Sequence, residues 1–194
     1  TIAADKSISG AITTADTLEG TITFANSATD TTAATTIGAG SHLLTAVNLG
    51  ANTGATATVS GIIHATNVLV NGAGTVHFGD AVNAGVNFDG EDTTITVAKN
   101  TQIAGAITTD VTNTGTLTYA DAATTTTVAG STIGASGKLL KAVNASAGTG
   151  TAKFSGNVYA TTITANAINS SGSDTIKFSG TVNATTLNLD STDG

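Results

Sequence analysis

The chain has 194 residues, of which 40% are hydrophobic and 10% are charged, with 23 glycines and no proline, cysteine, methionine or tryptophan. Its net charge is −7 and its basic residues are six dispersed lysines, so it lacks the clustered Lys or Arg that nucleic acids and anionic membrane surfaces require of a partner. The absence of cysteine excludes disulfides and thiolate metal sites, and no run of about 20 apolar residues predicts a transmembrane helix.

Short runs that alternate apolar residues with Thr, Asn or Ser occur along the whole chain. Such alternation, rich in β-branched side chains and free of proline, is typical of strands in a sheet. It predicts strands at residues 21–24, 57–59, 67–70, 75–78, 93–97, 116–119, 125–128, 161–165, 175–178 and 185–189. Residues 43–47 and 139–143 are short enough to be helical turns, but their fixed place in a repeat favours strands. Glycine- and serine-rich joints at residues 71–74 and 170–173 are predicted turns.

The same phrase occurs twice near the end of the sequence, at residues 153–164 and 177–188, with a spacing of 24 residues between Phe154 and Phe178. Each copy is a short run of alternating apolar residues that is interrupted by a Ser-Gly bend. A unit of this size cannot bury its own apolar side, so it needs a copy of itself above and below. The sequence therefore predicts an all-β fold. This fold is a β-solenoid, that is, a single-stranded parallel β-helix in which each coil stacks on the one before it.

A longer repeat encloses the short one. Residues 20–25 return as residues 115–120 at an offset of 95, and the offset grows to 100 toward the C-terminus. Insertions of this size are expected at turns, which project from a stack while the strands stay in register. We therefore expect two tandem modules, residues 1–100 and 101–194, the second continuous with the first. At about five coils each, they would form about ten coils and a rod of roughly 48 Å.

The three histidines, His42, His64 and His77, are the first candidates for a metal or catalytic site. The second module replaces them, in the same order, by Lys138, Tyr159 and Lys177. Because the repeat tolerates each replacement, we interpret the histidines as surface or turn residues.

The densest acidic cluster is Asp-Gly-Glu-Asp at residues 89–92, which lacks the regular Asp spacing of a calcium loop and is interpreted as a solvated turn. The other acids are scattered, arginine is absent and only 4% of residues are aromatic, which argues against a cleft that cleaves polysaccharides. Gly-x-Gly pairs at 38–40 and 148–150 lack the context of a phosphate-binding loop. We therefore expect no enzymatic activity, and no catalytic, cofactor-binding or metal-binding residue.

Thr-x-Thr pairs occur at residues 21/23, 94/96, 116/118 and 162/164. Two threonines spaced by two residues point to the same face of a strand, and a stack of such pairs makes a flat surface of hydroxyl and methyl groups. Known ice-binding solenoids resemble this, so ice binding is one hypothesis for the function. The pairs do not occur at one fixed place in every repeat, however, and the sequence therefore does not predict a continuous array.

The phrases at residues 20–25, 115–120, 154–162 and 178–186 resemble those of bacterial autotransporter passenger domains. Within that group they most resemble the large rickettsial surface antigens, outer membrane proteins A and B. The resemblance implies a right-handed coil, export through a C-terminal β-barrel outside this segment, and a place on the bacterial cell surface. Because the chain does not begin with Met, we expect it to be a segment of a longer protein whose export signal lies elsewhere.

The resemblance also implies a role as an adhesin or in a surface layer, and it assigns no site residue. The leading hypothesis is a non-enzymatic, structural and adhesive rod that contacts a host-cell surface protein through exposed strands and turns. The alternative is a self-assembling surface-layer or filament subunit whose partners are neighbouring copies of itself, since uncapped solenoid ends can stack. Neither hypothesis involves nucleic acid, a small-molecule substrate, a cofactor or insertion of this segment into a membrane.

Overall fold

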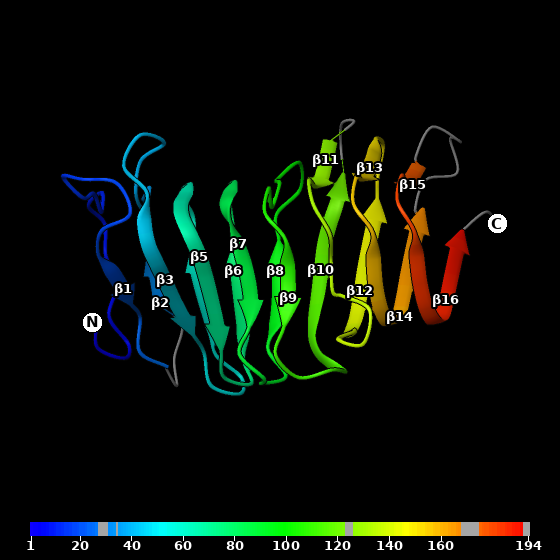
Figure 1. Ribbon diagram of the computed structural model, residues 1–194, viewed down its shortest axis with the longest axis horizontal. Coiled ribbons are helices and arrows are strands. Elements are labelled where there is room, and N and C mark those ends of the chain that lie inside the picture. Colours follow the sequence, from blue (N-terminus) through cyan, green and yellow to red (C-terminus); the bar gives the residue numbers. More distant parts are fainter. Residues whose placement is uncertain (27–30, 34, 123–125, 168–174, 192–194) are drawn as a thin grey trace.

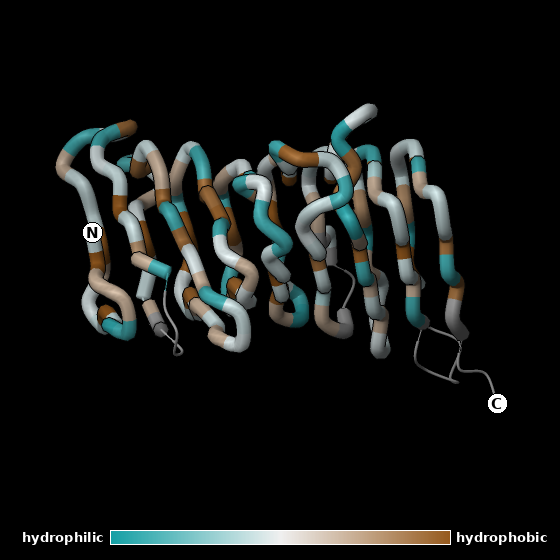
Figure 2. The backbone as a smooth tube through the Cα atoms, turned by 90° about the horizontal axis from the view of Figure 1, so that it is seen from below, coloured by the Kyte–Doolittle hydropathy of each residue, from teal (hydrophilic) through white to brown (hydrophobic). Residues whose placement is uncertain are grey.

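The computed structural model is a stack of parallel strands that forms a solenoid, and the part of the chain that it describes contains no helix (Figure 1). The described residues are 1–26, 31–33, 35–122, 126–167 and 175–191. Successive turns of the chain lie side by side along the axis, and the N- and C-terminal ends lie at opposite ends of the stack (Figures 1 and 2). The predicted all-β solenoid is therefore confirmed.

The described strands belong to three sheets, and every ladder within them is parallel. The five-stranded sheet consists, in order, of β1 (Thr21–Thr23), β3 (Leu44–Gly50), β5 (Ile63–Asn71), β7 (Val82–Phe88) and β9 (Ile107–Thr109). The eight-stranded sheet consists of β2 (Thr31–Ala33), β4 (Thr56–Val59), β6 (Thr75–Phe78), β8 (Thr94–Val97), β10 (Thr114–Ala122), β12 (Leu140–Ala147), β14 (Val158–Ala167) and β16 (Val182–Ser191). The three-stranded sheet consists of β11 (Thr126–Ala129), β13 (Thr151–Phe154) and β15 (Thr175–Phe178).

The number of coils is smaller than the sequence predicted. Seven steps separate the first and last strands of the eight-stranded sheet, so the solenoid has about seven turns instead of about ten. The number of residues in one step ranges from 18, between Asn67 and Gly85, to 26, between Thr116 and Ala142. The prediction took the shorter repeat spacing as the length of every coil, whereas most turns contain additional residues. At about 4.8 Å per step, seven steps span roughly 34 Å.

The long sequence repeat does not coincide with a whole number of turns. Phe24 follows β1 of the five-stranded sheet, and four steps along that face lead to Thr109 at the end of β9. Tyr119, the repeat equivalent of Phe24, comes ten residues later and lies on the eight-stranded sheet. The second copy of the repeat is therefore rotated by one face about the axis, because its 95 residues make four turns and part of a fifth.

Strand pairing is continuous across the middle of the sequence. Ile103 bridges Val82 on one side and Ala129 on the other, and β10 pairs with both β8 and β12. The first and second halves of the sequence therefore share one stack and one core.

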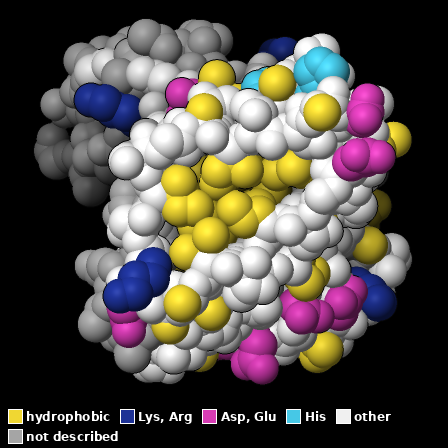
Figure 3. All heavy atoms as spheres, turned by 90° about the vertical axis from the view of Figure 1, so that its left-hand side faces the viewer, with side chains coloured by type: hydrophobic (Ala, Val, Ile, Leu, Met, Phe, Trp, Pro, Cys, Tyr) yellow, Lys and Arg dark blue, Asp and Glu magenta, His cyan; other side chains and the backbone are white. Residues whose placement is uncertain are grey.

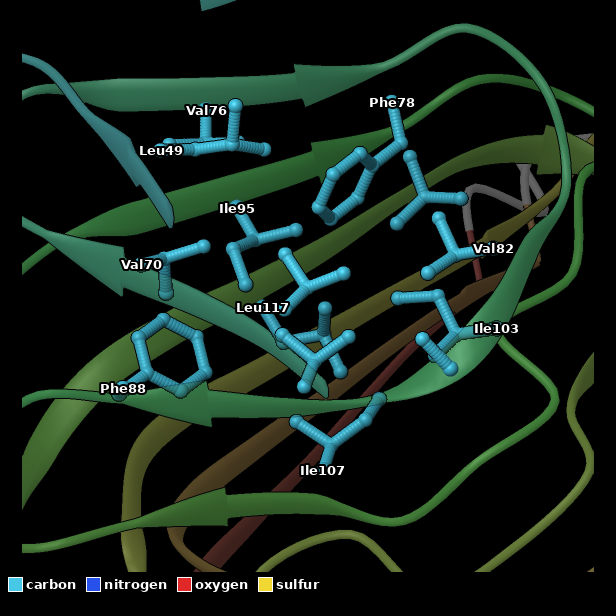
Figure 4. Packing of buried hydrophobic residues seen from close by; sticks show 14 of the residues in the cluster. Leu49, Val70, Val76, Phe78, Val82, Phe88, Ile95, Ile103, Ile107 and Leu117 are labelled. Carbon is cyan, nitrogen blue, oxygen red and sulfur yellow. The ribbon is translucent and has the colours of Figure 1, made fainter. Parts of the chain in front are cut away.

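The core is a narrow column of side chains that point inward from all three sheets. In β4, β6, β8 and β13 every second residue is buried, and the residues between them are half-buried and face outward. Fully burying one such Val, Ile, Leu or Phe side chain contributes about 1.5–3 kcal/mol to stability. Figure 4 shows part of this packing, which includes Leu49, Val70, Val76, Phe78, Val82, Phe88, Ile95, Ile103, Ile107 and Leu117.

The Ser-Gly bends of the repeated phrase have a structural reason. A Cβ atom on Gly61 would overlap the backbone of Thr35 in the preceding coil, and one on Gly156 would overlap the backbone of Ser131. Because the two coils approach this closely, only a residue without a side chain fits at the bend. The sequence signal that identified the repeat is therefore a requirement of stacking.

All ten predicted strand segments overlap observed strands, and the segments at 43–47 and 139–143 are confirmed as parts of β3 and β12. The predicted turn at 71–74 is confirmed just after β5, whereas Thr125 and residues 170–173 lie outside the described residues. The prediction missed β2, β7, β9 and β13. Two of these have only three residues, and β7 contains Gly85, which weakened its strand signal.

Candidate functional surfaces

The three histidines are half-buried, His42 in a turn before β3, His64 on β5 and His77 on β6. His42 closes a tight hairpin in which its backbone exchanges two 3.0 Å hydrogen bonds with Ala39. His64 on β5 lies 3.4 Å from the amide nitrogen of Asn83 through its Nδ1 atom. The Nδ1 atom of His77 on β6 is 2.8 Å from the Oγ1 atom of Thr96 on the next coil. Among the described residues, no three His, Asp or Glu side chains are grouped so that they could hold a metal ion.

The acidic turn at 89–92 forms part of a polar recess of about 590 Å³. The recess lies where four consecutive coils turn away from the five-stranded sheet. Its lining consists of Asn26, Asn52, Thr53, Asn71, Gly72, Ala73, Asp89 and Glu91. Neighbouring contributors are about one coil apart in the sequence, so no local motif could have indicated this surface.

The side-chain amides of the recess can both donate and accept hydrogen bonds, whereas its carboxylates accept them. Asp89 and Glu91 are exposed at its rim, whereas the Oδ1 atom of Asn71 is buried and has no hydrogen-bond partner. Asp92, the last residue of the acidic turn, forms an exposed ion pair with Lys141 of β12. The turn is therefore solvated, as predicted, and it also carries negative charge to the rim of a concave surface.

Threonines line the outer face of the eight-stranded sheet. Three of the Thr-x-Thr pairs, at 94/96, 116/118 and 162/164, lie on β8, β10 and β14 at the same position across the sheet. The pairs do not occupy one fixed place in every coil, as expected, since β6 and β12 carry none, but these three lie in line across the sheet. Only the pair at 21/23 lies elsewhere, on β1 of the five-stranded sheet. Turn insertions of different length obscured the alignment in the sequence, because they change the number of residues between strands that are neighbours in space.

One ionisable group with a raised pKa lies in the core and not on a surface. The ring of Tyr119 is 1% exposed, and burial raises the pKa of its phenol well above the ordinary value. The phenol oxygen has no hydrogen-bond partner. The phenol is therefore enclosed by the apolar side chains of the core.

Comparison with known proteins gives no relative. The sequence matches no family model, and no curated protein or solved structure matches the chain. In the described part of the chain there is also no helix of the length and apolarity needed to cross a membrane. Function has therefore to be argued from the fold and from its surfaces.

Proposed function

We propose that this chain is a non-enzymatic, adhesive rod of an exported bacterial surface protein, and that it contacts a host-cell surface protein. The observation that carries the proposal is the polar recess, which consecutive turns of a stacked coil build beside the acidic residues Asp89 and Glu91. A solenoid holds such turns at fixed spacing, so a partner meets a preorganised surface and little conformational entropy is lost on binding.

Two further features support this proposal. The absence of cysteine suits a chain that crosses a membrane unfolded, because no premature disulfide can form. The likeness of its repeated phrases to autotransporter passenger domains points to a bacterial cell surface as the location. The negative rim of the recess favours a basic patch on the partner, which would accelerate association at low ionic strength.

The binding of fluorescently labelled chain to cultured mammalian cells, measured by flow cytometry, tests the proposal. We expect saturable binding that disappears when cell-surface proteins are removed with protease. Glu91→Lys reverses one charge at the rim and should weaken binding, while Glu19→Lys, the same change at an exposed residue outside the recess, should leave it unchanged. Equal binding of all three chains, or binding that survives protease treatment, would contradict the proposal.

A second candidate function, self-assembly into a filament or surface layer, is favoured by the apolar ends of the stack. Leu187 and Leu189 on β16 are 48% and 74% exposed, whereas Ile163, the register partner of Leu187 one coil earlier, is fully buried. Figure 3 shows apolar side chains gathered at the centre of the N-terminal end, where Ile2 and Ile8 are only partly buried. Each end therefore presents core residues that another coil could cover.

Light scattering over a range of protein concentrations tests self-assembly. If copies stack end to end, the apparent mass should rise with concentration, and Leu189→Lys should hold the chain at the mass of a monomer. Val111→Lys, the same type of change at a residue that is 49% exposed on a turn in the middle of the stack, should assemble as the unmodified chain does. A constant monomer mass for the unmodified chain rules this function out.

A further inference from the structure

The outer face of the eight-stranded sheet carries two parallel columns of side chains that run across seven consecutive strands. The first column consists of Thr56, Thr75, Thr94, Thr116, Ala142, Thr162 and Thr186. The second column, two residues further along each strand, consists of Thr58, His77, Thr96, Thr118, Asn144, Thr164 and Asn188. Ten of these fourteen positions are threonine, and none is Asp, Glu, Lys or Arg.

General strand propensity does not account for this concentration of threonine. The matching outward columns of the five-stranded sheet are mixed, with Thr21, Ala46, Asn67 and Gly85 in one and Thr23, Asn48, Leu69, Asn87 and Thr108 in the other. The three-stranded sheet places Lys153 and Lys177 on its outer face, paired with each other and with Thr127. All three sheets belong to one stack, yet only the longest one repeats threonine at both positions.

The two columns form a regular grid. Neighbouring strands are about 4.8 Å apart, and residues two apart along a strand are separated by roughly 6.6 Å. Each grid point that is a threonine carries one hydroxyl and one methyl group. No register shift occurs between the two columns in any of these strand pairs, since the residues of both columns pair with the same offset on each step.

The threonines of the grid are held in place. They are half-buried except Thr186, which is exposed, and β-branching restricts the side chain to few rotamers. Hydrogen bonds along the column restrict them further: Asn144 donates through its Nδ2 atom to the Oγ1 atom of Thr118 at 3.2 Å, and Thr96 contacts the His77 ring at 2.8 Å. The grid is thus preorganised, and side-chain ladders of this kind also stabilise a flat sheet.

We propose that this outer face binds ice. Ice exposes planes on which water oxygens repeat in two dimensions on the same length scale as this grid. The hydroxyls can anchor water molecules at fixed points, and the methyl groups between them hold further waters in cages without competing for hydrogen bonds. Because protein and ice are both rigid, matching contacts add over the grid, with little entropy lost in ordering side chains. The absence of formal charge suits a crystal of neutral, tetrahedrally bonded water.

The four non-threonine positions divide the grid but do not remove it. His77 and Asn188 interrupt the second column only, and Ala142 and Asn144 interrupt both columns at β12. Between these interruptions, Thr94, Thr96, Thr116 and Thr118 on β8 and β10 form a complete two-by-two block. This block is the centre of the proposed face and the place where a substitution should have the largest effect.

Ice-crystal growth in a nanolitre osmometer tests the proposal directly. We expect the chain to show thermal hysteresis, a gap between the melting and freezing temperatures, and to give faceted crystals. Thr116→Lys places a long charged side chain in the central block and should abolish most of the gap. Thr108→Lys, the matched change at an exposed position on β9 of the five-stranded sheet, should keep it. Circular dichroism melting curves of both variants check that the fold is intact.

Conservative changes in the central block separate the two kinds of contact. Thr116→Val keeps the methyl group and replaces the hydroxyl by a second methyl, whereas Thr116→Ser keeps the hydroxyl and removes the methyl. A loss of hysteresis in both variants supports a grid that uses both groups, whereas a loss in one variant alone assigns the contact to the group that this variant lacks. Rounded crystals and no hysteresis for the unmodified chain overturn the proposal, as does an equal loss in Thr108→Lys and Thr116→Lys.

Discussion

The hydroxyl group of Tyr119 offers a direct test of the core. Tyr119 is 1% exposed, and its ring packs in a T-shaped arrangement against that of Phe154, with the ring centroids 5.4 Å apart and the planes at 83°. The phenol oxygen has no partner, and the equivalent residue of the first repeat is Phe24, which has no such oxygen. Tyr119→Phe should therefore keep the ring packing and remove only a polar group that is buried without a hydrogen bond.

Burying an unpaired hydroxyl costs about 1–3 kcal/mol, so Tyr119→Phe should raise the free energy of unfolding by that amount. In a chain of this size each kcal/mol corresponds to roughly 2–4 °C in melting temperature. Urea-induced unfolding followed by circular dichroism measures the change. Tyr159→Phe is the control: Tyr159 is half-buried, and its phenol oxygen lies 3.5 Å from the Nδ2 atom of Asn157, so its removal should bring no gain.

The same substitution should also change how stability depends on pH. Burial raises the pKa of Tyr119 in the folded chain, whereas the unfolded chain ionises this phenol near its ordinary value of about 10. Folding favours the neutral phenol. Its contribution to the free energy of unfolding is therefore complete below pH 10 and is lost as the pH rises above 10. The advantage of Tyr119→Phe should therefore grow by about 1.4 kcal/mol per pH unit above that value. A variant that is less stable than the unmodified chain, or a gain that is independent of pH up to 11, would refute this reasoning.

Three further perturbations follow from the packing and the surface. Phe154→Ala removes a fully buried ring and should lower the free energy of unfolding by about 3–5 kcal/mol in urea titrations; a loss below about 1 kcal/mol would contradict the packing described. Gly156→Ala should destabilise strongly because the new Cβ atom meets the backbone of the preceding coil. Gly10→Ala has open space and should raise the melting temperature slightly, so equal effects in calorimetry would argue against close stacking at the bend. Lys141→Ala breaks an ion pair whose two side chains are each 49% exposed, so its effect in chemical denaturation should stay below about 1 kcal/mol and vanish in high salt.

The interior of the solenoid was predictable from the sequence because its signal is local. Alternation of apolar and polar residues identifies a strand and its buried face within a few residues, as at Thr75–Phe78 and Thr175–Phe178. The Ser-Gly bends and the recurrence of near-identical phrases indicate that each such strand is covered by another like it. From these features the sequence alone determined a parallel, all-β stack with a narrow apolar core.

Which residues become neighbours on the outside was decided only by the tertiary structure. Pairing depends on the length of every intervening turn, and steps of 18 to 26 residues bring together positions that no fixed period connects. This is why the number of turns was overestimated, why the rotation of the second repeat by one face was not foreseen, and why the threonine columns and the recess at Asp89 and Glu91 escaped prediction. Strand formation depends on side chains within one segment. Register is instead a property of the whole coil, because the length of every turn decides which residues of neighbouring coils can pair their backbone hydrogen bonds.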